Sequence, residues 1–296
     1  MFRRISVKVA FFVNLVLFFV VGIGTVQLAK MQFLSLDDQY KTNARFSSMM
    51  AAKAVSRVFE EALDNRVLTA ADLFDTEYIP IPRTDPQKYH TKYDVYTDRA
   101  ILTLQDELLK DPNVIFAVTV DNNGYLPTHN SRYQKPLTGD RDKDRTGNRT
   151  KRIFNDPTGL AAAKNNQPGF LQIYKRDTGE TMWDISSPII VKGKQWGNFR
   201  IGLSIDTLLK AKISILKQLI ISMVSILTIS FVLIYLTVRG ALKPLTDLTT
   251  AAHKVVDGDV DAPIRIATKD EIGDLAEVLE RLRNRIKTII DPLKMK

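Results

Sequence analysis

Basic residues gather in the short run 148–152, and this is the part of the sequence best suited to recognising a ligand. A guanidinium group binds a carboxylate through two parallel hydrogen bonds, so neighbouring arginines favour a small organic anion. A histidine, an amide and a tryptophan from other segments complete the predicted pocket. The predicted ligand-binding residues are Arg149, Lys151, Arg152, His129, Asn130 and Trp183.

These residues also have structural alternatives. The cations of the run could pair with nearby aspartates to order the loop, and Trp183 could be a core or interface aromatic. His129 could bind a metal or a non-covalent haem, yet the chain has only 3 histidines and no second ligand at a suitable spacing. We therefore expect His129 to be a hydrogen-bonded structural residue, with no metal site and no cofactor. The aspartates in question are Asp140, Asp142, Asp144 and Asp156.

Composition excludes several classes of site. The chain has no cysteine, which excludes disulfides, cysteine–zinc sites, iron–sulfur clusters and covalently attached c-type haem. No Ser/His/Asp arrangement, phosphate-binding glycine loop or histidine-kinase motif is present, so we predict that the protein is not an enzyme. The net charge is +9, but the basic residues are scattered among nearly as many acids and no nucleic-acid-binding motif accompanies them. We expect no nucleic-acid partner.

Helices and strands must bring the pocket residues together. Apolar residues recur every three to four positions from about 33 to 75, which predicts a long helix, and Tyr93–Leu109 predicts a second. The turn 121–124 predicts a hairpin between the strands Val114–Val120 and Tyr125–His129. The other predicted elements are a short helix over Pro157–Asn165 and strands over Phe170–Lys175, Met182–Val191 and Trp196–Ile205, with turns at 177–179 and 192–194.

Two uncharged apolar runs, Val9–Ala29 and Leu219–Val238, are each long enough to cross a bilayer, which takes about twenty residues. Basic residues precede the first run and follow the second, which predicts that both ends lie in the cytoplasm and the segment between them outside. A cleaved signal peptide is the alternative for the first run. That run is longer than the apolar region of a signal peptide, and no small-residue cleavage site precedes Lys30.

Apolar residues near the C-terminus follow a heptad pattern. The first seam comprises Leu245, Leu248, Ala252 and Val255, and the second comprises Ile272, Leu275, Leu279, Leu282, Ile286 and Ile289. A single narrow stripe of this kind cannot be buried within one chain, so we predict a parallel helical bundle made by two copies, and hence a homodimer. Gly258 ends the first helix, and Asp270 with Glu271 begins the second.

The segment from Arg239 to Ile290 resembles the HAMP linker of bacterial transmembrane receptors. The resemblance is carried by Pro244-Leu245, Leu248, Gly258-Asp259-Val260 and Asp270-Glu271-Ile272-Gly273 with Leu275. It implies that a signal is relayed through Pro244, Leu248, Glu271 and Leu275. An ordinary coiled-coil stalk is the alternative, but a stalk would continue its heptads through residues 257–269, where this sequence breaks them.

Residues from about 33 to 206 resemble the extracytoplasmic Cache or PAS-like sensors of chemotaxis-receptor-like proteins. The resemblance rests on the order of the elements and on the motifs Asn123–Asn130, Asn148–Arg152 with Phe154–Asp156, Arg176–Glu180 and Trp196-Gly197. It implies an α+β membrane protein with two transmembrane helices, a PAS-like antiparallel sheet preceded by a long N-terminal helix, and a cytoplasmic, dimeric, parallel HAMP bundle.

Together these features predict a receptor in the bacterial inner membrane that senses a small anionic or polar ligand outside the cytoplasm. The predicted domains are the cytoplasmic N-terminus 1–8, transmembrane helix 9–29, extracytoplasmic sensor 30–212, transmembrane helix 213–238, HAMP domain 239–290 and C-terminal tail 291–296. No output domain follows, so we expect a separate cytoplasmic signalling protein to read residues 277–290, including Arg281, Arg283 and Arg285.

Two alternatives remain open for the function. The chain could be a fragment of a methyl-accepting chemotaxis receptor or of a sensor kinase. It could also be a membrane-anchored ligand-binding or scaffold protein without signalling output.

Overall fold

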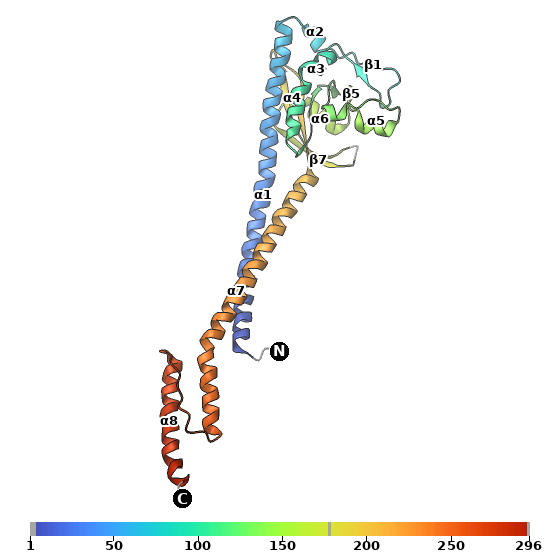
Figure 1. Cartoon of the computed structure of the whole chain (residues 1–296). Helices are drawn as coiled ribbons and strands as arrows, with labels where there is room; N and C mark the ends of the chain where they lie inside the picture. Colours follow the sequence, from blue (N-terminus) through green and yellow to red (C-terminus); the bar gives the residue numbers. More distant parts are fainter. Residues whose placement is uncertain (1–3, 177–178, 295–296) are drawn as a thin grey trace. The chain divides into compact units, whose positions relative to one another are not determined.

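The structure is a computed structural model that describes residues 4–176 and 179–294. The chain divides into two compact units, one formed by 1–29 with 217–296 and the other by 30–216. Two long helices, α1 (Ile5–Asp64) and α7 (Ile205–Val256), contribute to both units, and each contains an apolar stretch long enough to cross a membrane (Figure 1). Both predicted apolar runs therefore lie within continuous helices.

The unit 30–216, called the sensor unit below after the sensor that the sequence predicts there, is built on an antiparallel sheet. Its four strands have the order β3-β8-β7-β6, which confirms the predicted PAS-like arrangement. The strands are β3 (Val114–Asp121), β6 (Phe170–Lys175), β7 (Thr181–Val191) and β8 (Lys194–Ser204). The tight turn between β7 and β8 places Lys192 and Gly193 at positive φ, 48° and 82°, as a two-residue hairpin requires.

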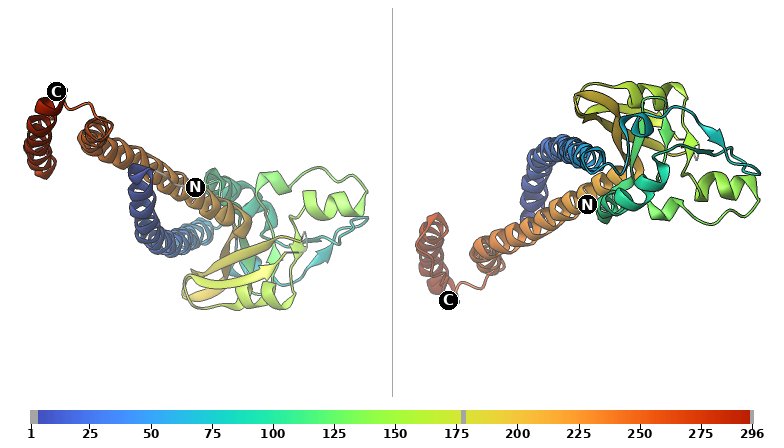
Figure 2. Two further views of the ribbon diagram at one scale, coloured as in Figure 1. Left: turned by 90° about the horizontal axis from the view of Figure 1, so that it is seen from below. Right: turned by 90° about the horizontal axis from the view of Figure 1, so that it is seen from above.

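The two faces of this sheet pack against different helices. Successive strand residues point to opposite faces, so alternate residues of β8 such as Phe199 and Ile201 face α1 and bury Val55 and Phe59 in the main core. The opposite face carries Phe116, Val118 and Met182, which pack with Ala163 of α6 (Pro157–Lys164). Views from below and from above show α1 and α6 on different sides of the sheet (Figure 2).

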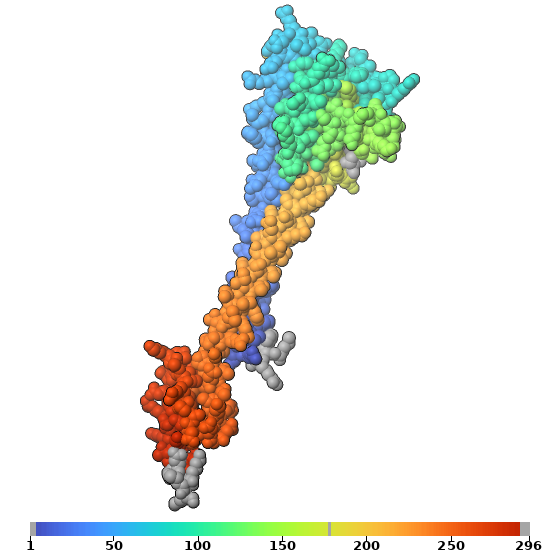
Figure 3. All heavy atoms as spheres, in the orientation of Figure 1, coloured from blue at the N-terminus to red at the C-terminus, as the bar shows by residue number. Residues whose placement is uncertain are grey.

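Short elements surround the sheet, and the chain from β1 to α6 forms much of the face of the sensor unit seen in Figure 3. They are α2 (Ala70–Leu73), β1 (Ile79–Pro80), β2 (Tyr89–His90), α3 (Asp94–Ala100), α4 (Leu102–Glu107), η1 (Leu108–Lys110), β4 (Tyr125–Leu126), η2 (Ser131–Tyr133), α5 (Arg141–Gly147) and β5 (Arg152–Ile153).

Two sequence expectations are wrong in detail. The first long helix ends at Asp64 and not near 75, because Arg66 takes a left-handed conformation (φ 57°) and Val67 N–H donates to the carbonyl of Ala62 at 2.8 Å. This is a Schellman-type end without glycine, so the sequence carries no signal for it. The predicted second helix, 93–109, is also broken into α3, α4 and η1.

The predicted hairpin at 121–124 is wrong in its pairing. The turn exists, but β4 pairs with β5 and not with β3. The carboxylate of Asp121 accepts hydrogen bonds from the backbone N–H groups of Asn123 and Tyr125, at 2.9 and 2.8 Å, and this turns the chain out of the sheet. The predicted turn at 177–179 includes two residues, 177 and 178, that lie outside the described part of the chain.

The unit that contains residues 217–296 ends in two helices that run in the same direction, the end of α7 and α8 (Glu271–Lys294) (Figure 1). Gly258 adopts a φ of +99° where α7 ends, as predicted. Leu248, Ile264 and Ala276 form a small core between these helices and the segment that joins them. Helix α8 continues past the predicted tail boundary at 291 and includes Pro292.

The two apolar helices of this unit also share a polar contact. Ser230 Oγ of α7 donates to Asn14 Oδ1 of α1 at 2.7 Å, and Asn14 Nδ2 donates to the carbonyl of Ala10 at 3.0 Å. Polar side chains are costly in a bilayer unless they find partners, and these two satisfy each other.

Candidate anion-binding cavity

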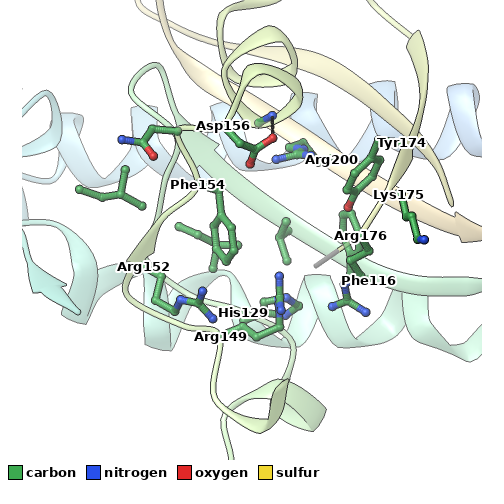
Figure 4. A pocket seen from close by; sticks show the side chains of 15 residues that line it. Phe116, His129, Arg149, Arg152, Phe154, Asp156, Tyr174, Lys175, Arg176 and Arg200 are labelled. Atoms are coloured by element: carbon green, nitrogen blue, oxygen red, sulfur yellow. Dashed lines mark hydrogen bonds between the residues drawn. The ribbon is translucent and has the colours of Figure 1, made fainter. Parts of the chain in front are cut away.

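A cavity of about 430 Å³ opens on the face of the sheet opposite α1. Figure 4 shows Arg149, Arg152 and His129 along one side of it, with Arg200 and Asp156 across from them. The lining residues are Phe116, Val118, Leu126, His129, Arg149, Arg152, Ile153, Phe154, Asn155, Asp156, Gly159, Tyr174, Lys175, Arg176 and Arg200. Basic side chains therefore outnumber acidic ones in the lining.

The strands supply a buried ion pair as the floor. Arg200 of β8 donates to both carboxylate oxygens of Asp184 on β7, with the shortest contact 2.7 Å from its Nη2, and Gln172 of β6 adds a bond of 2.8 Å. Both members of the pair are almost fully buried. This geometry fixes Arg200 and compensates much of its charge.

Beside the cavity floor, the ring of Phe116 lies close to the backbone of β8. Gly202 of β8 lies under the ring of Phe116, and a Cβ at position 202 would come within 2.2 Å of that ring. Glycine is therefore required for Phe116 to lie flat over β8 and line the cavity.

Arg149 and Arg152 form one wall together with an aromatic ring. Their guanidinium carbons lie 5.1 and 4.9 Å from the centre of the Phe154 ring, within the range of cation–π contacts. Both also donate to the carbonyl of Arg145 at the end of α5, at 3.3 and 3.1 Å. The ring and the carbonyl orient the two side chains towards the cavity.

Arg176 approaches from the end of β6. Its guanidinium lies over the rings of Tyr133 and Phe116, 5.0 and 5.7 Å from their centres, and its Nη1 lies 3.4 Å from the carboxylate of Glu180. Tyr174, two residues earlier on the same strand, has a pKa that burial raises to about 12. Its hydroxyl group is therefore a neutral donor at ordinary pH.

His129 lines the cavity as a neutral side chain. Its Nδ1 accepts a hydrogen bond from the backbone N–H of Asn130 at 2.8 Å, and its ring packs on Tyr133 at 4.6 Å. Burial first, and then the nearby charge of Arg149, hold its pKa well below the usual value. An accepting Nδ1 leaves the proton on Nε2, so His129 can donate one hydrogen bond but adds no charge.

The structure brings together three of the six residues predicted from sequence, Arg149, Arg152 and His129. Lys151 turns away and pairs with Asp98 at 2.7 Å and with Asp94 at 3.3 Å. Asn130 Oδ1 accepts from the backbone N–H of Ala117, so it attaches this segment to β3. Trp183 lies on the other face of the sheet, in the core beside α1.

Two of the four aspartates that could have paired with the basic run serve as helix caps, and the carboxylate of Asp142 lies 3.7 Å from Arg145. Asp140 caps α5 and Asp156 caps α6 through backbone N–H groups. Asp144 accepts from the N–H groups of Thr138 and Gly139, at 2.8 and 3.0 Å. Among the residues that the structure describes, no group of three or more His, Asp or Glu side chains could hold a metal ion.

Several cavity residues were not predicted from the sequence, chiefly Arg176, Arg200, Phe116 and Tyr174. Strand alternation carried a signal for two of them. Phe116 alternates with Ala117 on β3, and Arg200 lies between two buried apolar residues of β8, so both must point to the face that α1 does not cover.

The predicted relay residues occupy different environments. Pro244 lies inside α7, and Leu248 is buried within the single chain at 1% exposure. Glu271 begins α8 at the surface, and Leu275 is 45% exposed. The predicted partner surface also changes, because Arg283 is buried and donates to the backbone carbonyl of Val260 and to Glu280.

Residues 236–288 match the family model of the HAMP domain. No curated protein sequence matches the chain. The chain therefore contains a HAMP domain, two helices able to span a membrane, and between them an antiparallel-sheet unit.

Solved structures with a detectable likeness include three bacterial domains. The sensor domain of DcuS from E. coli is 18% identical, with 38% of this chain and 72% of that chain covered and a TM-score of 0.28. An extracellular ligand binding receptor from Desulfohalobium retbaense is 16% identical, with 62% and 27% covered and a TM-score of 0.31. The ligand-binding domain of the Pseudomonas fluorescens chemoreceptor CtaA, in complex with L-valine, is 14% identical, with 59% and 67% covered and a TM-score of 0.28. Likeness at this level specifies no ligand.

Proposed function

We propose that this HAMP-containing chain is a transmembrane signalling receptor that binds a small anion in the cavity of its sensor unit. The receptor lies in the bacterial inner membrane, with the sensor unit outside the cytoplasm and the HAMP domain inside. It relays ligand binding to a separate cytoplasmic signalling protein. The basic residues that flank the two apolar helices support this orientation.

The observation that carries the proposal is the chemistry of the cavity. Arg149, Arg152 and Arg176 converge on one space, and the aromatic rings of Phe116 and Phe154 lie beside them. A cavity of about 430 Å³ is within the size range of small-molecule sites. Guanidinium groups above an apolar wall favour a small carboxylate or a similar anion with an apolar body.

The connection of the cavity to the second apolar helix supports a relay. Arg200 on the cavity floor belongs to β8, which ends at Ser204, and α7 begins at the next residue, Ile205. No loop separates the two elements. A ligand that shifts β8 would therefore displace the start of α7, and packed interfaces convert small displacements into discrete states.

A homodimer is supported by apolar residues that the single chain leaves exposed. Leu275, Leu282 and Ile289 recur every seven residues on α8 and are 45, 52 and 67% exposed. A heptad seam of this kind is buried in helical bundles by a partner helix. A second copy of the chain supplies that partner in our proposal.

The ligand is tested by thermal-shift measurements on the full chain in nanodiscs, with a panel of small carboxylic acids and amino acids. We expect at least one carboxylate to raise the melting temperature, and Arg149→Ala to weaken its binding at least tenfold. Arg99→Ala is the matched control, because Arg99 lies exposed on α3. Unchanged affinity in Arg149→Ala would show that the anion does not bind in this cavity.

The dimer is tested by cysteine crosslinking in membranes. Leu275→Cys and Ile289→Cys should each crosslink between copies, whereas Glu277→Cys on the other side of α8 should not. Leu248→Cys is a poorer probe than the sequence suggests, because Leu248 is buried within one chain. No crosslink at 275 or 289 would contradict the parallel dimeric bundle.

A further inference from the structure

Lys88 is a buried lysine that lies behind the wall of the cavity and outside its lining. Only 4% of the residue is exposed. Its Nζ donates to Asn148 Oδ1 and to the carbonyl of Thr150, both at 2.5 Å, and lies 3.4 Å from the carbonyl of Asn148. These hydrogen bonds of the Lys88 ammonium group all go to the two residues that flank Arg149, Asn148 and Thr150.

We infer that Lys88 is a positioning residue of the anion site, which fixes the run 148–152 so that Arg149 and Arg152 point into the cavity. The inference rests on the proposed function for its biological meaning. We call the hydrogen bonds from Lys88 Nζ to Asn148 and Thr150 the clamp. The clamp can be tested without any ligand.

The run has other attachments, but Lys88 supplies a different kind of contact from its backbone N–H bonds. The backbone N–H groups of Arg149 and Lys151 donate to the carbonyls of Tyr133 and Leu126, both at 2.8 Å. These bonds use the N–H groups of the run, while Lys88 satisfies its carbonyls at 148 and 150. An ammonium group with its three donors suits a set of oxygen acceptors, whereas a buried carbonyl without a partner costs about 1–3 kcal/mol.

Lys88 itself belongs to a segment held by backbone hydrogen bonds. Its backbone carbonyl accepts from Ile81 N–H at 2.8 Å, and its N–H donates to Thr84 Oγ1 at 3.0 Å. The next residue, Tyr89, donates from its N–H to the carbonyl of Lys151 at 2.8 Å. The segment from β1 to β2 thus acts as a frame that supports the run from outside the cavity.

The electrostatic surroundings of Lys88 make its role measurable. Burial first, and then the nearby charges of Arg152 and Lys151, lower the pKa of Lys88 to about 8, while Asp144 acts in the opposite direction. Among the described residues, no carboxylate lies within ion-pair distance of its Nζ. An anion in the cavity favours the protonated amine, so anion affinity falls as the pH rises through about 8.

Two other titratable groups of the cavity, His129 and Tyr174, do not titrate in this pH range. The pKa of His129 lies well below its usual value, and that of Tyr174 is about 12. Neither changes charge between pH 7 and 9.5 by these values. A change in affinity within this interval that is lost in Lys88→Met therefore reports on Lys88.

The clamp is tested first by hydrogen exchange on the full chain in nanodiscs without ligand. Lys88→Met should speed exchange of the amides of Arg149 and Lys151 several-fold, whereas the exposed control Lys92→Met should not. Equal exchange in the two variants would overturn the positioning role. If Lys88→Met does not fold, Lys88→Arg takes its place, and it should retain protection because it keeps charged donors.

The second test uses sulfate, whose charge is constant from pH 7 to 9.5, as the probe. Wild-type affinity should fall at least threefold over this interval, whereas Lys88→Met should bind weakly with no pH dependence. A flat wild-type profile would overturn the role of the Lys88 charge. Sulfate could fail to bind at pH 7 while slow exchange at 148–152 still depends on Lys88. That result would contradict the proposed anion site but not the attachment of the run by Lys88.

Discussion

The run 148–152 in the sensor unit and the HAMP connector 257–270 are irregular segments fixed in a similar way. In each, a cation from a neighbouring element donates to backbone carbonyls. Lys88 donates to the carbonyl of Thr150, and Arg283 of α8 donates to the carbonyl of Val260. Both cations are buried, although the sequence gives no sign that either is used internally.

The two clamps differ in their counter-charges. Arg283 is paired with Glu280, which also accepts from the backbone N–H of Ile264 at 2.8 Å. Lys88 has carbonyl and amide oxygens around it instead. The hydrogen bond from Arg283 lowers the pKa of Glu280 to about 2, whereas burial lowers that of Lys88 to about 8. Arg283 and Glu280 therefore keep their charges from neutral pH up to pH 9.5, whereas Lys88 loses its charge as the pH rises through about 8.

The segments also differ in apolar anchoring. Val260 and Ile264 of the connector are buried, the latter in the small core with Leu248 and Ala276. The run 148–152 has polar attachments and the stacking of its arginines on Phe154. We conclude that the connector is fixed mainly by apolar burial, and the basic run mainly by hydrogen bonds that a ligand or a proton can alter.

The largest effect is expected at the buried pair on the cavity floor, which is the sensor unit's counterpart of the pair Arg283–Glu280. Arg200→Met leaves the carboxylate of Asp184 buried without its partner, and we expect a loss of about 3–5 kcal/mol of unfolding free energy. Urea titration followed by tryptophan fluorescence measures it, because both tryptophans of the chain, Trp183 and Trp196, lie in the sensor unit.

The double variant Arg200→Met with Asp184→Leu is the control for this prediction. It removes both charges, so much of the lost stability should return. Similar instability in the single and double variants would mean that packing, and not the unpaired carboxylate, sets the cost.

The next largest effect tests the apolar anchoring of the connector. Ile264→Ala removes buried methyl groups from the HAMP core and should cost about 2–5 kcal/mol in local stability. Hydrogen exchange of residues 257–270 measures the loss in the full chain. Val256→Ala is the matched control, because Val256 is 82% exposed; comparable exchange in both variants would contradict apolar anchoring.

The fold could be predicted from the sequence more completely than the cavity. Strand and helix positions follow from local periodicity and from turns such as Lys192-Gly193, which is why β6 and the start of α6 agree with expectation. The pairing of β4 with β5 depends on side-chain hydrogen bonds of Asp121, which periodicity does not reveal.

Whether a cation faces a ligand or stays internal depends on contacts between segments far apart in the chain. Lys151 and Arg152 are neighbours in sequence, yet one pairs with Asp98 of α3 and the other lines the cavity. Lys151 takes a left-handed conformation, φ 58°, and its side chain is paired with Asp98. Composition alone therefore identified the basic run but not the role of each member.

A smaller effect separates the two clamps by pH. Because the pKa of Glu280 is about 2 in the folded chain and about 4.3 when unfolded, its contribution is present above about pH 4.3 and is lost as the pH falls towards 2. Glu280→Gln should speed exchange at Val260 and Ile264 several-fold at pH 7, with no further change up to pH 9.5. If exchange at Val260 and Ile264 rose between pH 7 and 9.5 beyond the intrinsic pH dependence, the two clamps would not differ in pH dependence as predicted.

A rise in pH is expected to affect stability and anion binding in opposite directions through Lys88. Its folded pKa of about 8 lies below the unfolded value of about 10.4, so the unfolded chain holds more protons between these values and stability rises with pH. Anion affinity falls over the same interval. Urea titrations of wild type at pH 7 and 9.5 should therefore show a more stable sensor unit at 9.5, and Lys88→Met should remove that gain.

The smallest effect concerns Thr150, which lies between the two arginines of the wall. Its Oγ1 donates to the carbonyl of Pro127 at 3.0 Å, so Thr150→Val removes one hydrogen bond at nearly constant volume and should cost about 1 kcal/mol. Thr150→Ser keeps the hydroxyl group and should retain most of the stability. We expect Thr150→Val to speed exchange at 148–152 less than Lys88→Met does, because it leaves the carbonyls of the run satisfied. A larger effect from Thr150→Val would mean that the hydroxyl group, and not the lysine, is the main attachment of the basic run.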